Sequence, residues 1–396
     1  MQGILGLPIQ TRITFIRKTV SLFFLAGIFL SFKLWISNRF FPLVPVSGNL
    51  PVLPHAVNYG LAILLILLLG INLFLERRVI NFSLILILMI LLIADQNRWH
   101  PWVYIYFLLL ILLCFPLQSC FPPQSIEKQL NLFSCLQLII IGVYIWSGIH
   151  KLNPNFINIT FYNILTNLFW FKSPELLRVI KPFGYFIPVV EIGIGLALYF
   201  PQFRNIGVYT AIITHLFILI YLSPLGINSN SAVYPWNVAM ICLAFLLFYK
   251  VKDKIQIAGQ GIGQLYGIAI ILLIYMLPIL NFFGYWDHYL SFSLYSDKTK
   301  AYYIAIGEKE LPKINKSLAT YFLPIKGLQG GQIIDVNKWC LGELNVPFYP
   351  ESRVFKQVAK TFCTLGIQED QLYFLEFELP LEKGKYTRFT CKDLKD

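Results

Sequence analysis

Five ionisable residues lie inside or at the ends of long apolar segments, and their types could do chemistry. Asp95 stands in IADQNRWHPW, and His150 and Lys151 end the run YIWSGIHKLNPNF. Glu191 lies within VVEIGIG, and His215 lies within IITHLFIL. Because a charged group is costly at membrane depth, an ionisable residue there is by default a candidate for function.

Lys151 could act as a base or serve only as an anchor. A lysine at a helix end commonly extends its ammonium group to the membrane surface and has no chemical role. Lys151, however, follows the polar break Ser147-Gly148. If its amine is buried, desolvation favours the neutral form, which can accept a proton, whereas a nearby Asp95 would favour the ammonium. For Glu191 and His215, which lie within spans, the alternative to a chemical role is an ordinary contact between helices.

These residues belong to a chain with the composition of a membrane protein. Of its 396 residues, 57% are hydrophobic and 13% are charged, and the mean hydropathy is +0.65. A soluble domain has about 45–50% apolar and about 25% charged residues, so this class is excluded, as is disorder. Nine segments approach the roughly 20 apolar residues of a membrane span. They are about 14–36, 58–75, 79–95, 102–121, 129–149, 184–201, 204–223, 232–250 and 263–285.

The basic residues favour one orientation in the membrane. The net charge is +12, and residues 1–296 carry 17 Lys and Arg against 7 Asp and Glu. With a cytoplasmic N-terminus, ten basic residues lie in inner loops and seven in outer loops before the tail, as the positive-inside rule favours. We therefore expect a bacterial inner-membrane protein with a periplasmic C-terminal tail. Membrane lipid is the expected partner of the basic loops, and nucleic acid is not, because no compact basic cluster occurs.

In this orientation several candidate residues approach the outer face. Asp95, His150 and Lys151 could face one cavity there, with Trp99 and Tyr144 as aromatic walls. The glutamate and the histidine within later spans lie deeper. No two histidines have the spacing of metal ligands, and no hydrolase, phosphate-binding or dinucleotide motif occurs, so we predict no metal site.

The sequence predicts an all-α polytopic membrane bundle with a small extramembrane α+β domain. The bundle of about nine transmembrane helices spans residues 1–289, and the extracytoplasmic domain spans residues 290–396. The composition of the tail changes sharply to shorter, more polar segments. Strand or helix patterns occur in the tail at 301–307 (strand), 351–365 (helix), 372–379 (strand) and 386–391 (strand).

One apolar segment between the fifth and sixth spans is not a predicted span. Asn155–Ile180 is interrupted by four asparagines at spacings close to one helical face. This pattern predicts an interfacial or re-entrant helix on the outer side, or a surface helix that only covers the bundle.

The seven cysteines do not form a disulfide framework. Four lie in apolar segments and are expected to be inert packing residues, namely Cys114, Cys120, Cys135 and Cys242. Three lie in the tail: Cys340, Cys363 and Cys391. One disulfide among these three fits an oxidising compartment, and the sequence leaves its pairing open.

Several motifs resemble the vitamin-K-dependent γ-glutamyl carboxylases. YIWSGIHKLNPNF resembles the segment with the catalytic lysine of that family, with Lys151 at the lysine position and His150 replacing the basic residue before it. ADQNRWHPWVYIY resembles the family's Asp-x-x-x-Trp stretch, followed by tyrosine. FRNIG and His215 fit an Arg-x-Ile-Gly run and a later histidine, and Glu191 stands near an acidic position. The motifs keep their order over about 94–249, the core of the wider horizontally transferred transmembrane domain (HTTM) family.

The resemblance implies a quinone-linked membrane enzyme. A reduced, vitamin-K-like quinone would enter from the lipid, and Lys151 and His150 would be the catalytic residues. With O2 the quinol would yield a strong base, and CO2 would trap the carbanion, in a site that must exclude water. The substrate or quinone pocket would be lined by Asp95, Trp99, Tyr144, Glu191 and His215. Two features depart from the family: Trp102 replaces a histidine, and the tail is too short to recognise a propeptide.

Two hypotheses of function follow from these patterns. The first is a quinone-linked membrane enzyme that modifies an exported protein substrate. The alternative is a non-enzymatic membrane scaffold or accessory protein, whose outer C-terminal domain binds a partner in maturation or secretion. In the alternative, Lys151 and Asp95 would form only a structural pair. A transporter is less favoured, because no pair of Gly- or Pro-broken spans indicates inverted repeats.

Overall fold

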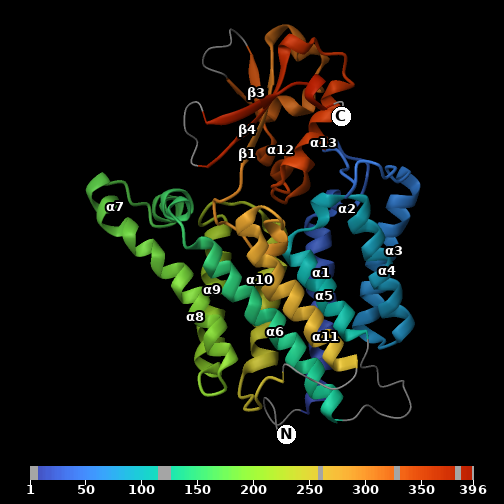
Figure 1. Cartoon of the computed structure of the whole chain (residues 1–396), viewed down its shortest axis with the longest axis vertical. Coiled ribbons are helices and arrows are strands. Elements are labelled where there is room, and N and C mark those ends of the chain that lie inside the picture. The colour runs from blue at the N-terminus through green and yellow to red at the C-terminus, as the bar shows by residue number, and fades with distance from the viewer. Residues whose placement is uncertain (1–7, 115–125, 257–261, 325–330, 380–384, 395–396) are drawn as a thin grey trace.

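Apolar helices form a bundle that carries a small sheet-and-helix region at one end, in a computed structural model of the chain (Figure 1). The structure describes residues 8–114, 126–256, 262–324, 331–379 and 385–394. The predicted fold class is confirmed: the chain is a polytopic helical bundle with a small C-terminal α+β region. The division at residues 289 and 290 stays a prediction.

Seven helical stretches are long and apolar enough to cross a membrane, by length and composition. They are Ile9–Leu30, His55–Phe74, Gln129–Lys151, Pro174–Tyr199, Arg204–Leu222, Ser231–Phe248 and Leu265–Phe283. Two shorter apolar helices, Arg78–Ala94 and Pro101–Leu113, stand at the third and fourth predicted spans. Each of the nine predicted spans therefore contains helix in the described part of the chain. The end of the predicted 102–121 span, with Cys120, lies outside the described residues.

The bundle has an enclosed centre and a lipid-facing side. Its helices are α1 (Ile9–Leu30), α2 (Phe32–Trp35), α3 (His55–Phe74), α4 (Arg78–Ala94), α5 (Pro101–Leu113), α6 (Ile126–Lys151), α8 (Phe186–Tyr199), α9 (Arg204–Leu222), α10 (Tyr234–Phe248) and α11 (Ile262–Ile270). In α5 every residue except Ile111 is buried. In contrast, α8 and α9 expose large apolar side chains such as Val189 and Ile213. An exposed apolar face of this kind is expected where lipid covers the helix.

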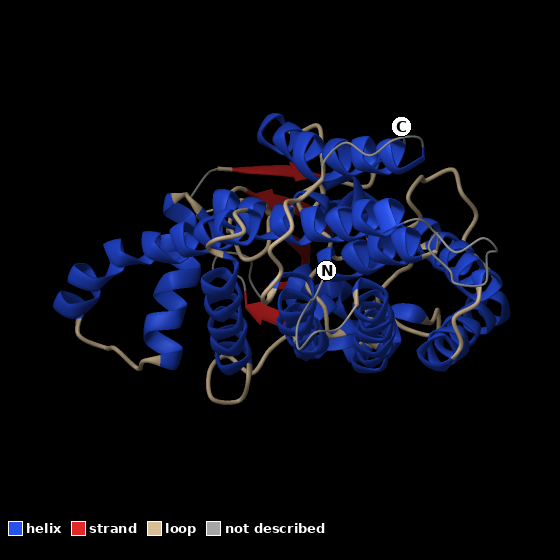
Figure 2. Cartoon of the chain, turned by 90° about the horizontal axis from the view of Figure 1, so that it is seen from below, coloured by secondary structure: helices blue, strands red, loops and turns tan. Residues whose placement is uncertain are grey.

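The segment between α6 and α8 differs from its prediction. Two short π-helical stretches come first, Phe156–Phe161 and Ile164–Leu168. After a break, α7 (Pro174–Ile180) begins and continues toward α8 as one helical run, Pro174–Tyr199. These two helices stand at one side of the bundle (Figures 1 and 2). Ser173 explains the break, because its hydroxyl accepts a hydrogen bond from the Leu176 N–H and caps the helix. The second half of the predicted interfacial helix thus belongs to a candidate span.

The tail contains one five-stranded antiparallel sheet with the strand order β2-β3-β1-β4-β5. The strands are β1 (Ala301–Ile306), β2 (Phe322–Pro324), β3 (Gln332–Asp335), β4 (Leu372–Phe377) and β5 (Tyr386–Phe389). The helices of the tail are α12 (Val336–Leu344) and α13 (Ser352–Cys363). Phe355 of α13 packs against Phe374 and Phe389 on one face of the sheet. The predicted strands and the predicted helix at 351–365 are present, whereas α12 and the short strands β2 and β3 were not predicted.

Polar contacts fix the tail on the bundle. The Glu343 carboxylate accepts hydrogen bonds from the backbone N–H groups of Phe40 and Phe41, at 2.5 and 3.0 Å. Arg353 donates to both oxygens of Asp287, at 2.8 and 2.5 Å. A bidentate arginine–carboxylate pair fixes orientation as well as distance. The tail therefore has a defined placement relative to the helices.

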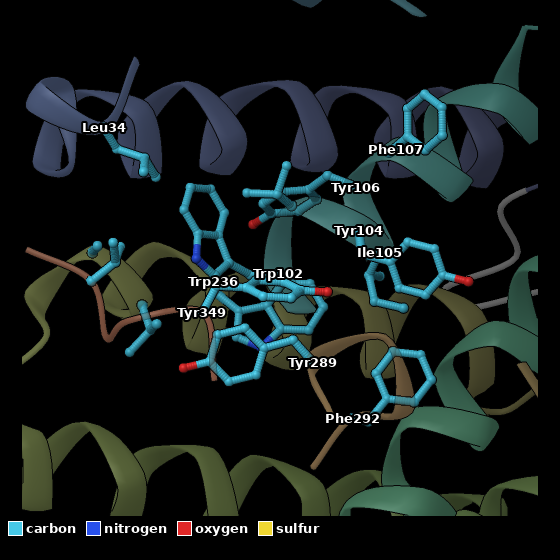
Figure 3. Close-up of a cluster of buried hydrophobic side chains, with 14 of the residues drawn as sticks. Leu34, Trp102, Tyr104, Ile105, Tyr106, Phe107, Trp236, Tyr289, Phe292 and Tyr349 are labelled. Carbon is cyan, nitrogen blue, oxygen red and sulfur yellow. The ribbon is translucent and has the colours of Figure 1, made fainter. Parts of the chain in front are cut away.

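Buried aromatic side chains make the core continuous between bundle and tail (Figure 3). Tyr106 of α5 meets Trp236 of α10 edge to face, with ring centres 5.3 Å apart. Tyr289 contacts Tyr349 of the tail in the same manner, also at 5.3 Å, and lies 5.0 Å from His100. Such pairs add about 0.5–1.5 kcal/mol each beyond the area they bury. The tail is thus packed onto the bundle and is not a loosely tethered appendage.

One disulfide joins two segments of the tail, and it gives the cysteine pairing that the sequence left open. Cys363 at the end of α13 is bonded to Cys391, 28 residues later and just beyond β5. Cys340 is free and buried. Because structural disulfides persist in oxidising compartments, this bond is typical of a domain outside the cytoplasm.

We predict that Cys391→Ser lowers the free energy of unfolding of the tail by about 2–4 kcal/mol, because the unfolded tail gains conformational freedom. Limited proteolysis at increasing temperature measures this change in the full-length protein. Cys242→Ala in α10 is the matched control and should leave the tail as resistant as in the wild type. Equal resistance of the Cys391→Ser tail would contradict the prediction, as would free thiols at both positions before reduction.

Candidate functional site

A cavity of about 470 Å³ lies in the bundle between α6, α8, α9 and α10. Its walls are mostly apolar, and aromatic side chains such as Trp102, Phe156 and Trp236 contribute to them. Three of the predicted site residues besides Lys151 also line it, namely Tyr144, Glu191 and His215. The structure thus brings four of the seven predicted residues into one place.

Lys151 and Glu191 form a buried ion pair at one wall of this cavity. Lys151 Nζ lies 2.8 and 2.7 Å from the two carboxylate oxygens of Glu191. It also donates to Ser147 Oγ at 2.7 Å. The side chains of the pair are only 9% and 7% exposed. The amine thus donates to three oxygen atoms, two of them on one carboxylate, which is the geometry of a buried charge-assisted pair.

Close helix packing brings the two partners together. Lys151 is the last residue of α6, and Gly148 lies one turn before it. A Cβ atom at Gly148 would stand 2.6 Å from the Pro188 carbonyl oxygen in α8, and one at Gly195 would stand 2.6 Å from Ile145. Glycine at both contacts lets the two backbones approach, as in other membrane helix pairs. This approach places the ammonium group opposite the carboxylate.

A second polar chain crosses the cavity from α6 to α10. The Tyr144 hydroxyl lies 2.8 Å from His215 Nε2, and His215 Nδ1 lies 2.8 Å from Asn237 Oδ1. Asn237 Nδ2 donates to the Val233 carbonyl oxygen, which fixes the amide orientation. Nδ1 of the imidazole therefore donates to Asn237, and in the neutral ring Nε2 accepts from the tyrosine hydroxyl. Among the described residues, the hydrogen bonds of the His215 ring go to the uncharged side chains of Tyr144 and Asn237.

His150 does not line the cavity. Its ring stacks on Phe282 at 5.0 Å and lies 5.8 Å from Trp146. Neither ring nitrogen has a hydrogen-bond partner among the described residues. The His150 side chain thus points away from the cavity that Lys151 lines, because successive residues of a helix face different directions.

Asp95 and Trp99 also lie apart from the cavity, contrary to the expectation of one shared pocket. The Asp95 carboxylate lies 2.5 Å from Arg39 and 3.9 Å from Arg98, and all three side chains are fully buried. The Trp99 indole donates to the Leu92 carbonyl oxygen at 2.9 Å. Asp95 therefore pairs with two arginines and not with Lys151. The Lys151–Asp95 pair expected under the alternative hypothesis is wrong.

Several residues that line the cavity were not predicted from the sequence. Asn237 completes the polar chain, and its signal was an amide inside the apolar run YPWNVAMICLAF. His100 and Trp102 also line the cavity, at the start of α5. Trp102 enters the sequence analysis only as a departure from a motif, because nothing in the local sequence indicates that this turn faces the later helices.

A comparison with protein families assigns the middle of the chain differently from the motifs. Residues 129–232 match the model of the family described as "Methylamine utilisation protein MauE". The match covers about a quarter of the chain and includes Tyr144, Lys151, Glu191 and His215. No curated protein and no solved structure matches the chain. The resemblance to γ-glutamyl carboxylases and to the HTTM family is therefore wrong, and the chemistry with O2 and CO2 that it implied loses its basis.

We predict that the Lys151–Glu191 pair is coupled in stability. Lys151→Met alone leaves a buried carboxylate without its counter-charge and should cost about 3–5 kcal/mol of unfolding free energy. Lys151→Met combined with Glu191→Leu should recover most of this loss. Unfolding of the four proteins in detergent by added dodecyl sulfate measures the cycle. Additive effects of the two single changes would contradict a direct pair.

Asp95 should prove essential for folding. Asp95→Asn keeps the shape of the side chain but leaves Arg39 and Arg98 buried without a counter-charge, at a cost of about 3–5 kcal/mol. The same denaturation assay measures this loss. Glu175→Gln, at an exposed carboxylate, is the control and should change stability by less than about 0.5 kcal/mol. A fully stable Asp95→Asn protein would show that the arginines find other partners.

Proposed function

We propose that the protein is a non-enzymatic membrane accessory protein whose C-terminal domain binds an exported partner protein during maturation or secretion. The match of the central helices to a family named for methylamine utilisation supports an accessory role in the membrane. It gives no support to a carboxylase. The partner is a protein that is itself carried across the membrane.

The observation that carries this proposal is a face of the tail sheet that no helix covers among the described residues. Side chains alternate across the strands, so Tyr303 of β1, Leu375 of β4 and Arg388 of β5 share the face opposite α13. Leu375 is half-buried and Arg388 is exposed, and Tyr386 on the same face is 47% exposed. The packing partners of α13 lie on the other face. A sheet face of apolar and aromatic residues that no helix covers in the described part of the tail suits a protein partner.

The placement of the tail supports such a role. The bidentate Arg353–Asp287 pair and the Glu343 contacts hold the sheet in one orientation on the bundle. A partner bound to the sheet would therefore be held at a defined place above the helices. Pre-organisation of this kind lowers the entropic cost of binding.

The proposal includes a bacterial inner membrane and a tail on its outer side. The Cys363–Cys391 bond supports an oxidising compartment for the tail. The excess of basic residues in the loops on the other side supports the same orientation. In Figure 1 the tail lies at one end of the helices, away from the connection between α8 and α9.

A second candidate function is a quinone-linked membrane enzyme acting on an exported substrate. The cavity with its buried ion pair and its Tyr144–His215 contact favours this candidate. In such an enzyme the Glu191 carboxylate would orient a bound hydroxyl group by accepting its hydrogen bond, because the three N–H groups of Lys151 already donate to Ser147 and Glu191. An enzyme predicts a changed covalent mass of the exported protein, whereas an accessory role predicts a changed amount.

We predict that Leu375→Glu abolishes the accessory function without unfolding the protein, because a charge at the centre of the sheet face opposes apolar docking. Exported proteins are quantified by mass spectrometry in a strain without the gene and in complemented strains. At least one exported protein should fall in the deletion strain, with unchanged transcript, and should stay low with Leu375→Glu.

Lys360→Glu on the exposed side of α13 is the matched control and should restore that protein fully. The amount of each variant in the membrane is measured in parallel. Full restoration by Leu375→Glu would contradict the docking face. If deletion changes no exported protein, the accessory role itself is wrong.

A further inference from the structure

We propose that the cavity between α6, α8, α9 and α10 binds a neutral, lipid-soluble molecule with an oxygen-bearing ring, of the quinone or quinol class. The ring would lie between the Lys151–Glu191 pair and the side chains of His100 and Trp102. This site lies in the membrane bundle and is independent of the proposed partner of the tail.

Unpaired polar atoms in the cavity wall indicate a ligand with polar groups. His100 Nε2 and Trp102 Nε1 have no hydrogen-bond partner among the residues that the structure describes, and each residue is only 2% exposed. Asn230 Oδ1 is also buried and without a donor there. All three residues line the cavity. Buried polar groups nearly always find partners, so an oxygen that accepts from the Trp102 indole N–H, as a quinone carbonyl does, suits this wall, and the hydroxyl of a quinol can in addition donate to Asn230 Oδ1.

The charges around the cavity select a neutral molecule. Lys151 and Glu191 already neutralise each other at 2.7 Å. An anion would compete with Glu191 for the ammonium group, and a cation would compete with Lys151 for the carboxylate. Either would leave one buried charge without a partner, which is strongly unfavourable. A neutral hydroxyl group, as in a quinol, can donate to a Glu191 oxygen without displacing Lys151.

The apolar walls of the cavity favour a ligand that is largely apolar and soluble in lipid. Trp102, Phe156 and Trp236 are flat side chains in the lining, and flat rings stack well on such walls. Phe186 and Ile213 line the cavity too, although they are 69% and 66% exposed on α8 and α9. The cavity therefore reaches the side of the bundle that faces lipid. A ligand with an apolar chain could enter from the membrane and leave its chain at this opening.

The experiment titrates the purified full-length protein in detergent with menaquinone-4. Binding is followed by quenching of tryptophan fluorescence and by the rise in unfolding temperature. We expect saturable binding that neither oleate nor dodecyltrimethylammonium displaces. Displacement by oleate, or the absence of saturable binding, would overturn the proposal.

Two neighbouring valines give a matched pair of variants. Val190 lines the cavity, whereas Val189 is 54% exposed on the outer face of the same helix. Val190→Phe should fill the cavity and weaken binding at least tenfold, and Val189→Phe should bind as the wild type does. Equal binding by both variants would assign the signal to partition into the micelle and overturn the site.

Trp102→Phe is a second variant, which keeps an aromatic side chain at this position and removes the indole N–H. It should weaken binding about 3- to 10-fold, the loss of one hydrogen bond. Unchanged affinity would place the ligand away from this wall and overturn the assigned position of the ring. Leu375→Glu in the tail should leave menaquinone-4 binding unchanged, so failure of the quinone site and failure of the partner role are distinguishable.

Discussion

The central constraint in this membrane bundle is that two opposite charges, Lys151 and Glu191, are buried among apolar helices. Neither charge is tolerable there alone, because the low-polarity interior does not solvate it. The pair therefore requires α6 and α8 to lie close enough for contact at 2.7 Å. Glycines at 148 and 195 permit that approach. The same contact forms one wall of the cavity, so the stability of the bundle and the chemistry of its site depend on one interaction.

The spans and several tail elements could be predicted from sequence, for identifiable physical reasons, and four of the seven candidate residues that the sequence marks lie together in one cavity. Hydropathy over about 20 residues reports burial in lipid directly, and the cost of intramembrane charge marks Lys151 and Glu191. The same rule marks Asp95, but its partner Arg39 lies 56 positions away, so no local pattern indicates their pairing. Strands β2 and β3, with three and four residues, are too short to give a pattern. The motif resemblance failed because each motif consists of a few residues, and such short matches carry a high risk of false positives.

Between the membrane cavity and the tail the structure is continuous. Asn230 donates to the Tyr295 hydroxyl at 2.9 Å, and both residues line the membrane cavity and a second cavity of about 330 Å³ beside the sheet. The aromatic contacts of Tyr289 extend from His100 to Tyr349 in the tail. The helices, the cavity and the sheet thus form one packed unit. In the proposed function the bundle supplies a fixed platform and a ligand site, and the tail supplies the surface for a protein partner.

The most direct test of the central claim is the ionisation state of Glu191 in the membrane. Infrared difference spectra between the wild type and Glu191→Gln, recorded in lipid vesicles at neutral pH, distinguish an ionised carboxylate from a protonated carboxylic acid. A buried ion pair predicts that the wild type has an ionised carboxylate band that the variant lacks, and that Lys151→Met shifts this band. A protonated acid band at Glu191 in the wild type would contradict the buried ion pair and the selection of a neutral ligand that depends on it.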